Sequence, residues 1–192
     1  MNQKTYLLAF CGLAVAINVL GGSVVSGLKI PLLFLDAVGT IFVAVVYGPA
    51  AGFLVGLITN LVLGVTTGPT NIPFGLVNGA IGLVVGYIAR YYRFNLVTAV
   101  VTGVILAIVA PLIGTPIAVA VFGGLTGGGM DVFVLWLQKS GAGIFAAAFV
   151  PRVISNLVDK ILCCVLIAVI IQQLPKSLLE RIGYEGGKRY AA

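Results

Sequence analysis

Long apolar runs, separated by short stretches rich in glycine and polar residues, occupy most of the chain. A helix needs roughly 20 apolar residues to cross the hydrocarbon core of a bilayer. The runs are continuous and do not alternate with polar positions, which favours spanning helices over the strands of a barrel. Six runs are predicted to span a membrane: Thr5–Leu20, Leu32–Tyr47, Ala50–Val65, Ile72–Tyr91, Leu96–Phe122 and Phe149–Leu174.

The connections between these runs carry glycine and proline. The two longest, Gly21–Pro31 and Gly123–Ala148, are predicted to be loops, and the second holds an apolar stretch, Val132–Leu137, that suits a short helix on the membrane. Pro111 and Pro116 lie inside the fifth run. Because proline removes a helical hydrogen bond, we expect a bend there.

Small residues recur at every fourth position through the third run and its flanks. Steps of four turn a helix by about 400°, so such residues form one ridge. A ridge without side chains lets another helix backbone approach closely, which is how helices associate in lipid. The single amide in the ridge is therefore expected to face protein or a cavity. The ridge consists of Gly48, Gly52, Gly56, Asn60, Gly64 and Gly68.

The composition supports the same class of protein. Of the 192 residues, 60% are hydrophobic and 8% are charged, whereas soluble domains carry about 25% charged residues. No polar stretch is long enough to fold alone. The sequence therefore predicts an all-α membrane protein with six transmembrane helices, formed by one integral membrane domain over residues 1–192.

Lysine and arginine set the expected orientation, because they concentrate on the cytoplasmic side of membrane proteins. Only Lys29 and Lys139 would lie in outer loops if the N-terminus is inside. We therefore expect both termini in the cytoplasm, including a tail over about residues 175–192, and the two long loops outside. The basic residues that then fall on the cytoplasmic side are Lys4, Arg90, Arg93, Lys176, Arg181, Lys188 and Arg189.

Several functions are excluded by what the sequence lacks. The net charge of +6 arises from basic residues at helix ends and does not indicate nucleic-acid binding. The chain has no histidine, no phosphate-binding G-x-x-x-x-G-K-[ST] motif and no Cys/His cluster, so we expect no enzymatic activity, no metal and no cofactor. The three cysteines lie in apolar segments and suit packing better than disulfides.

Polar side chains inside the apolar runs gather at one depth. Each such group is costly in a bilayer and calls for a partner or a cavity. With the orientation above, they lie in the outer halves of the spans, and the inner halves are nearly featureless. We therefore predict a pocket just below the outer surface, under the two long loops. The polar residues are Asp36, Thr40, Asn60, Asn71, Asn78, Arg152, Asn156, Asp159 and Lys160.

Structural roles compete with ligand binding at several of these positions. Asp36 could simply support the loop above it, and Asp159 and Lys160 could pair with each other or with Arg152. Trp136, the only tryptophan, is either an anchor at the membrane interface or a lid that stacks on a flat ligand. The sequence does not decide between these alternatives.

Three motifs stand out between the second and fourth runs: L-D-A-V-G-T at Leu35–Thr40, the Y-G-P-A-A-G turn at Tyr47–Gly52 and P-F-G-L-V-N-G at Pro73–Gly79. In these motifs the chain resembles the substrate-binding S components of energy-coupling factor (ECF) vitamin transporters. Six spans in fewer than 200 residues fit as well. The similarity extends over essentially the whole chain and is clearest from Leu33 to Arg90.

The resemblance implies a binding subunit in the cell membrane that captures a vitamin-like molecule outside the cell. It implies docking on a T component through a small-residue motif on the first helix, matched here by Gly12 and Ala16 with glycine at the first position. Two partner ATPases would drive transport by toppling this chain in the membrane, so ATP belongs to the partners. The implied ligand site contains Lys29, Asn71, Asn78, Trp136, Arg152 and Asn156.

Two other functions remain as alternatives to a binding subunit. One is a self-sufficient secondary carrier or facilitator, although carriers usually show internal repeats with broken helices. The other is an assembly subunit without a ligand, which would leave the polar cluster unused. The ligand also stays open, since riboflavin, pyridoxine, a thiamine precursor, and a nucleobase or nucleoside all suit amides and both signs of charge.

Overall fold

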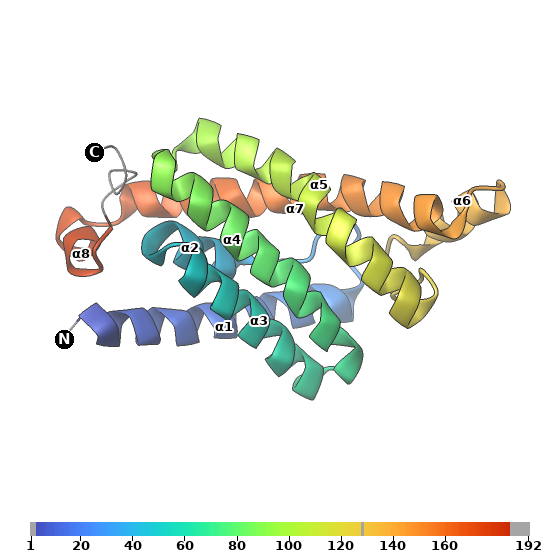
Figure 1. Ribbon diagram of the computed structural model, residues 1–192, viewed down its shortest axis with the longest axis horizontal. Coiled ribbons are helices and arrows are strands. Elements are labelled where there is room, and N and C mark those ends of the chain that lie inside the picture. Colours follow the sequence, from blue (N-terminus) through green and yellow to red (C-terminus); the bar gives the residue numbers. More distant parts are fainter. Residues whose placement is uncertain (1–2, 128, 185–192) are drawn as a thin grey trace.

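The computed structural model describes residues 3–127 and 129–184, and the regular structure within these ranges is entirely helical (Figure 1). Lys188 and Arg189, which we expect to be cytoplasmic, lie outside the described residues. The helices in chain order are α1 (Gln3–Leu28), α2 (Val38–Tyr47), α3 (Pro49–Thr66), the 3-10 helix η1 (Pro69–Phe74), α4 (Gly75–Tyr91), α5 (Leu96–Phe122), α6 (Asp131–Lys139), α7 (Ile144–Gln173) and α8 (Lys176–Arg181).

Within the described residues, five helical segments are long and apolar enough to cross a membrane, so the chain is a multi-pass membrane protein by length and composition. They are Lys4–Leu28, Pro49–Thr66, Pro69–Tyr91, Leu96–Phe122 and Ile144–Gln173. The remaining apolar helix, α2, has 10 residues. Ten residues rise about 15 Å, half of a hydrocarbon core. The predicted six full spans are therefore five spans and one short buried helix.

The predicted second span, Leu32–Tyr47, is wrong in its first part. Leu32 and Leu35 have φ angles of 68° and 53°, which a right-handed helix cannot contain. The backbone N–H groups of Phe34 and Leu35 donate instead to the Asp159 carboxylate on α7. A side chain from a distant helix thus replaces the helical hydrogen bonds of this segment.

The two predicted long loops are both shorter than expected. Gly21 and Gly22 do not end α1, which continues to Leu28. A Cβ on Gly21 would lie 2.6 Å from the Leu35 carbonyl oxygen, so these glycines serve a close approach and not a turn. The loop predicted over Gly123–Ala148 ends at Gly143, where α7 begins, and contains α6 as the expected short helix.

The ridge of small residues on α3 is confirmed as a packing surface. A Cβ on Gly52 would lie 3.1 Å from the Gly82 Cα atom of α4, and one on Gly56 would collide with the Asn78 backbone. Asn60 is buried, as expected for the amide in this ridge. The glycines therefore set the short distance between α3 and α4.

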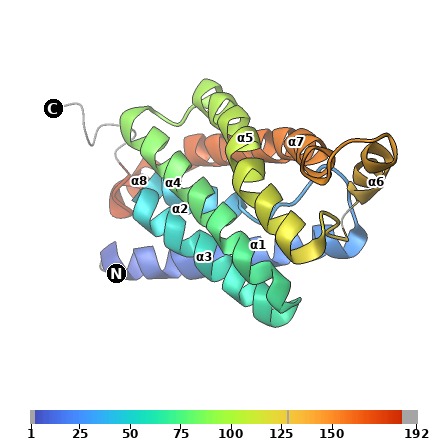
Figure 2. The same ribbon diagram turned by 45° about the vertical axis from the view of Figure 1, so that its right-hand side comes forward.

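The short helix α2 lies at the centre of the bundle, where it packs against α1, α3, α4 and α7 (Figure 2). The most extensive helix pairs around it are α5 with α7 and α3 with α4. α5 is one continuous helix through Pro111 and Pro116, with the predicted bounds. The N-terminus and α8 lie at one end of the molecule and α6 at the other (Figure 1). Towards the first end, the bundle interior is an apolar core that includes Val85, Ala89, Cys164, Ile167 and Ile171.

A buried amide connects the first three helices. Asn18 of α1 donates to the hydroxyl oxygens of Thr40 (2.9 Å) and Thr59 (3.0 Å) and accepts the Gly39 N–H (2.7 Å). All three polar side chains are fully buried. This network was not among the sequence predictions.

We expect Asn18→Leu to lower the free energy of unfolding by about 3 kcal/mol, because it leaves the Gly39 N–H and two hydroxyl groups without partners. Thermal unfolding of the purified protein in detergent measures the loss. Leu13→Ala, on the exposed face of the same helix, is the control and should change little. Equal melting temperatures for the two variants would contradict this role of Asn18.

Candidate solute-binding site

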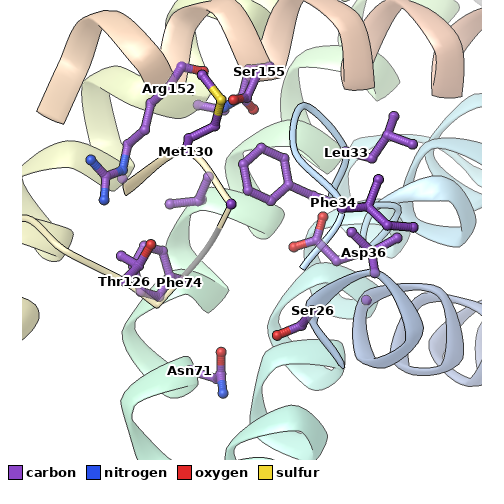
Figure 3. Close-up of a pocket in the computed structure, with 18 of the residues that line it drawn as sticks. Ser26, Leu33, Phe34, Asp36, Asn71, Phe74, Thr126, Met130, Arg152 and Ser155 are labelled. Atoms are coloured by element: carbon purple, nitrogen blue, oxygen red, sulfur yellow. The ribbon is translucent and has the colours of Figure 1, made fainter. Parts of the chain in front are cut away.

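A cavity of about 580 Å³ lies toward the end of the bundle remote from α8, and Figure 3 shows it in close-up. Small-molecule sites in proteins typically measure 300–1,000 Å³. Its wall combines the C-terminal ends of α1, α3 and α5, the segment 29–36, η1, the start of α4, Thr126, the segment 129–131, Val134 of α6 and the first half of α7. Every helix except α2 and α8 therefore contributes to the cavity.

The floor of the cavity holds a buried ion cluster. The Lys160 ammonium lies 2.6 Å from one Asp159 carboxylate oxygen and 3.5 Å from the Asp36 carboxylate. The other oxygen of Asp159 accepts the N–H groups of Phe34 (2.8 Å) and Leu35 (3.0 Å). Lys160 also lies 5.6 Å from the centre of the Phe34 ring. The cluster fixes the α1–α2 connection to α7.

One side of the cavity is a ladder of three amides from consecutive elements. Asn78 of α4 donates to the Asn60 side-chain oxygen (3.2 Å) and to the Asp36 backbone oxygen (2.9 Å). Asn60 of α3 donates to the Asn71 backbone oxygen (3.2 Å). The glycine contacts between α3 and α4 make this ladder possible, because they bring the two helix backbones close. The ladder also holds η1 in place.

The opposite side of the cavity comes from the first half of α7. Asn156 donates its N–H to the Arg152 backbone oxygen (2.8 Å), and the Ser155 hydroxyl donates to the Pro151 oxygen (3.0 Å). The Arg152 guanidinium donates to the backbone oxygens of Ala148 (2.8 Å) and Gly124 (3.1 Å). Arg152 thereby ties the segment after α5 to α7.

The family model for the ECF transporter substrate-specific component matches residues 7–171 of this chain. The chain belongs to this family. The match runs from α1 to α7 and contains every residue that lines the cavity. No curated protein and no solved structure matches the chain.

Membership makes this chain a substrate-binding component of a transporter, which is not a class of enzyme. Within the described ranges, the S component has no group of three His, Cys, Asp or Glu residues that could hold a metal. Its cavity therefore relies on amides, hydroxyls, charged groups and apolar surface. These suit an organic solute.

Nine residues are expected at the ligand site of the S component: the polar positions of the apolar runs other than Thr40 and Lys160, together with Lys29 and Trp136. Seven of the nine line the cavity. Asp159 is fully buried behind Lys160, and Lys160 is the one of this pair that lines the cavity. Trp136 lies on α6 with 64% of its surface exposed, and the same helix turns Val134 toward the cavity instead. The seven that line it are Lys29, Asp36, Asn60, Asn71, Asn78, Arg152 and Asn156.

The aromatic surface of the site comes from residues that the sequence prediction missed. Phe74 of η1 and Phe122 at the end of α5 both line the cavity, with ring centres 6.1 Å apart. They offer the flat apolar contact that Trp136 was expected to provide. Phe74 stands in the P-F-G-L-V-N-G motif, between the predicted site residues Asn71 and Asn78, and this position was the available signal.

The predicted docking residues of the S component lie on its surface. Gly12 and Ala16 are both exposed on α1, and an added Cβ on Gly12 would meet nothing within 4 Å. The same face of the helix carries exposed apolar side chains, including Leu13 and Leu20. This face remains available to lipid or to another membrane helix.

Proposed function

We propose that this S component captures a small heterocyclic solute from outside the cell and delivers it through an ECF transporter. The observation that carries the proposal is the asymmetry of the bundle. One end holds the polar cavity, and the apolar core that includes Val85, Ile167 and Ile171 fills the bundle toward the other end. Such an arrangement suits a receptor that binds from one side and lacks a path of its own across the membrane.

We place the S component in the plasma membrane. In the proposed orientation, the cavity opens to the outside of the cell and both termini lie in the cytoplasm. The distribution of basic residues supports this orientation. Five of them belong to helix ends or connections at the end of the bundle remote from the cavity: Lys4, Arg90, Arg93, Lys176 and Arg181. Positively charged residues favour the cytoplasmic side.

The proposed partners are a T component and two ATPases, which would rotate the loaded S component in the membrane. An apolar outer surface favours that motion, since no charge on the lipid-facing side of α1 would have to cross the hydrocarbon core. The exposed residues of α1 between Leu8 and Leu28 are apolar or small, with Ser26 as the exception near its end.

Reconstitution in liposomes tests the proposal. The S component alone should retain a small molecule, detected by mass spectrometry after release, and should not transport it. Uptake should require the T component, both ATPases and ATP. Uptake by the S component alone would support a secondary carrier, and failure to retain any molecule would support an assembly subunit.

Gly12→Leu should leave solute binding unchanged and lower ATP-driven uptake at least tenfold. Leucine adds a bulky side chain to a flat exposed surface, and Gly12 lies before Gly22, the first residue of α1 that lines the cavity. Small residues are what allow close helix contacts in membranes. Ala50→Leu, at an exposed small residue of α3 that does not line the cavity, is the matched control. Normal uptake by the Gly12 variant would contradict docking at this position.

A further inference from the structure

The cavity wall exposes hydrogen-bond acceptors, because the amide nitrogens of Asn71 and Asn156 are turned toward protein oxygens. Asn71 donates to the Thr67 hydroxyl oxygen (3.0 Å) and the Gly68 backbone oxygen (3.1 Å). Asn156 donates to the Arg152 backbone oxygen (2.8 Å). Because backbone oxygens only accept, the amide nitrogens must face them, and this fixes the two side-chain oxygens on the other side.

These two oxygens accept no hydrogen bond from any described residue, and both side chains line the cavity. Figure 3 shows the Asn71 oxygen directed toward the open centre of the pocket and its nitrogen directed away. Inside the amide ladder, Asn78 donates two hydrogen bonds and Asn60 donates one. A solute therefore meets amide oxygens at this wall.

The charges at the floor point to the same kind of solute. Two carboxylates, Asp36 and Asp159, surround the single ammonium of Lys160. Asp159 is the closer partner, at 2.6 Å, and it also accepts two backbone N–H groups. Asp36 is 3.5 Å from Lys160, and 31% of its side chain is exposed. Its carboxylate faces the pocket (Figure 3), so the floor presents a negative charge that Lys160 only partly neutralises.

The cations of the wall are partly engaged by the protein. Two of the five N–H groups of the Arg152 guanidinium donate to backbone oxygens, at Ala148 and Gly124. Lys160 is already paired with two carboxylates. Lys29 is exposed at the rim, where the Asp131 carboxylate also lines the cavity and accepts the Thr126 and Gly127 N–H groups.

We infer that the solute is an amine-bearing heterocycle, neutral or with one positive charge, whose N–H groups donate to Asp36, Asn71 and Asn156. This inference rests on the proposed function of the cavity as the solute site. An analogue with a carbonyl or carboxylate in place of the amine would leave these acceptors unpaired and would repel Asp36. Sites built from such buried polar groups discriminate strongly against analogues that lack the matching group.

Matched compounds measure this preference on the purified full chain in lipid nanodiscs at pH 7. The probes are pyridoxamine with 4-pyridoxate, cytosine with uracil, and thiamine with oxythiamine. On each skeleton that binds, calorimetry should give a dissociation constant about 10- to 100-fold lower for the amine than for its oxo or carboxylate partner. A molecule released from the native protein should carry N–H donors.

The variant Asp36→Asn distinguishes loss of the carboxylate charge from general disruption of the site. Lys160 keeps Asp159 at 2.6 Å, so the variant should fold, and its affinity for the amine probe should fall about tenfold while the preference over the oxo partner narrows. Glu180→Gln on α8, an exposed carboxylate at the other end of the molecule, should change neither.

Two results would overturn the inference and leave the receptor function standing: tighter binding of the oxo or carboxylate probes, or an unchanged preference in Asp36→Asn. A released molecule without an N–H donor would do the same. If the native protein releases no small molecule and none of the probes binds, the proposed function fails together with the inference.

Discussion

Asp159→Leu should lower the free energy of unfolding by about 3–5 kcal/mol, because removal of one partner of a buried ion pair leaves the other charge uncompensated. Lys160 would retain only Asp36, at 3.5 Å. The N–H groups of Phe34 and Leu35 would also lose their acceptor, and with it the contact that holds the α1–α2 connection on α7. Thermal unfolding in detergent measures the change.

The double variant Asp159→Leu with Lys160→Met separates charge from backbone support. Leucine and methionine of similar volume remove the unpaired ammonium, so the double variant should be more stable than Asp159→Leu alone. The stability that the double variant still lacks relative to the wild type measures the cost of the two unpaired N–H groups. Melting of Asp159→Leu at the wild-type temperature, or no recovery in the double variant, would contradict the role assigned to this cluster.

Gly82→Ala should destabilise the protein by about 3 kcal/mol, although it adds a single methyl group. The new Cβ would collide with the backbone of Gly52 and approach the Phe53 nitrogen to 2.6 Å, and a backbone cannot rotate away as a side chain can. Forcing extra volume into a packed interface costs typically 1–3 kcal/mol, and more when backbones must move. Separation of α3 from α4 would also stretch the Asn60–Asn78 hydrogen bond and weaken solute binding.

Gly12→Ala is the matched control for Gly82→Ala. Its Cβ would enter open space, and alanine is the better helix former, so stability should stay equal or rise by up to about 1 kcal/mol. Thermal unfolding of both variants, with solute binding to each, gives the comparison. Similar melting temperatures would mean that the α3–α4 contact tolerates a wider spacing than the structure shows.

The sequence predicted those features that depend on a regular pattern. The four-residue spacing of small residues predicted the α3–α4 contact, and the run Leu96–Phe122 matches α5 residue for residue. The depth of the polar groups predicted the end of the bundle at which the cavity lies. These features follow from helix geometry and from the cost of polar groups in lipid, both of which act on any sequence.

Features that depend on tertiary contacts were not predictable from the sequence alone. Gly21 and Gly22 have the composition of a loop, yet they lie in α1 because Leu35 and Asp36 pack against them. Leu32 and Leu35 are apolar and suggest a span, yet both have left-handed φ angles. The Leu35 N–H donates to Asp159, which lies 124 residues further along the chain.

The rotation of a helix about its axis explains why two residues expected at the ligand site, Asp159 and Trp136, do not line the cavity. Asp159 and Lys160 are adjacent, both polar, and about 100° apart around α7, so only the packing of α7 decides which one lines the cavity. Trp136 and Val134 pose the same question on α6, where the smaller residue faces inward. A single sequence carries no information on the rotation of so short a helix.

A structure of the S component purified from its native membrane, with the molecule that it retains, tests the central claim most directly. We expect that molecule in the cavity between η1 and α7, within hydrogen-bond distance of Asp36, Asn71 and Asn156. A molecule bound elsewhere would contradict the account. So would a continuous water-filled path from this cavity to the end that holds the termini.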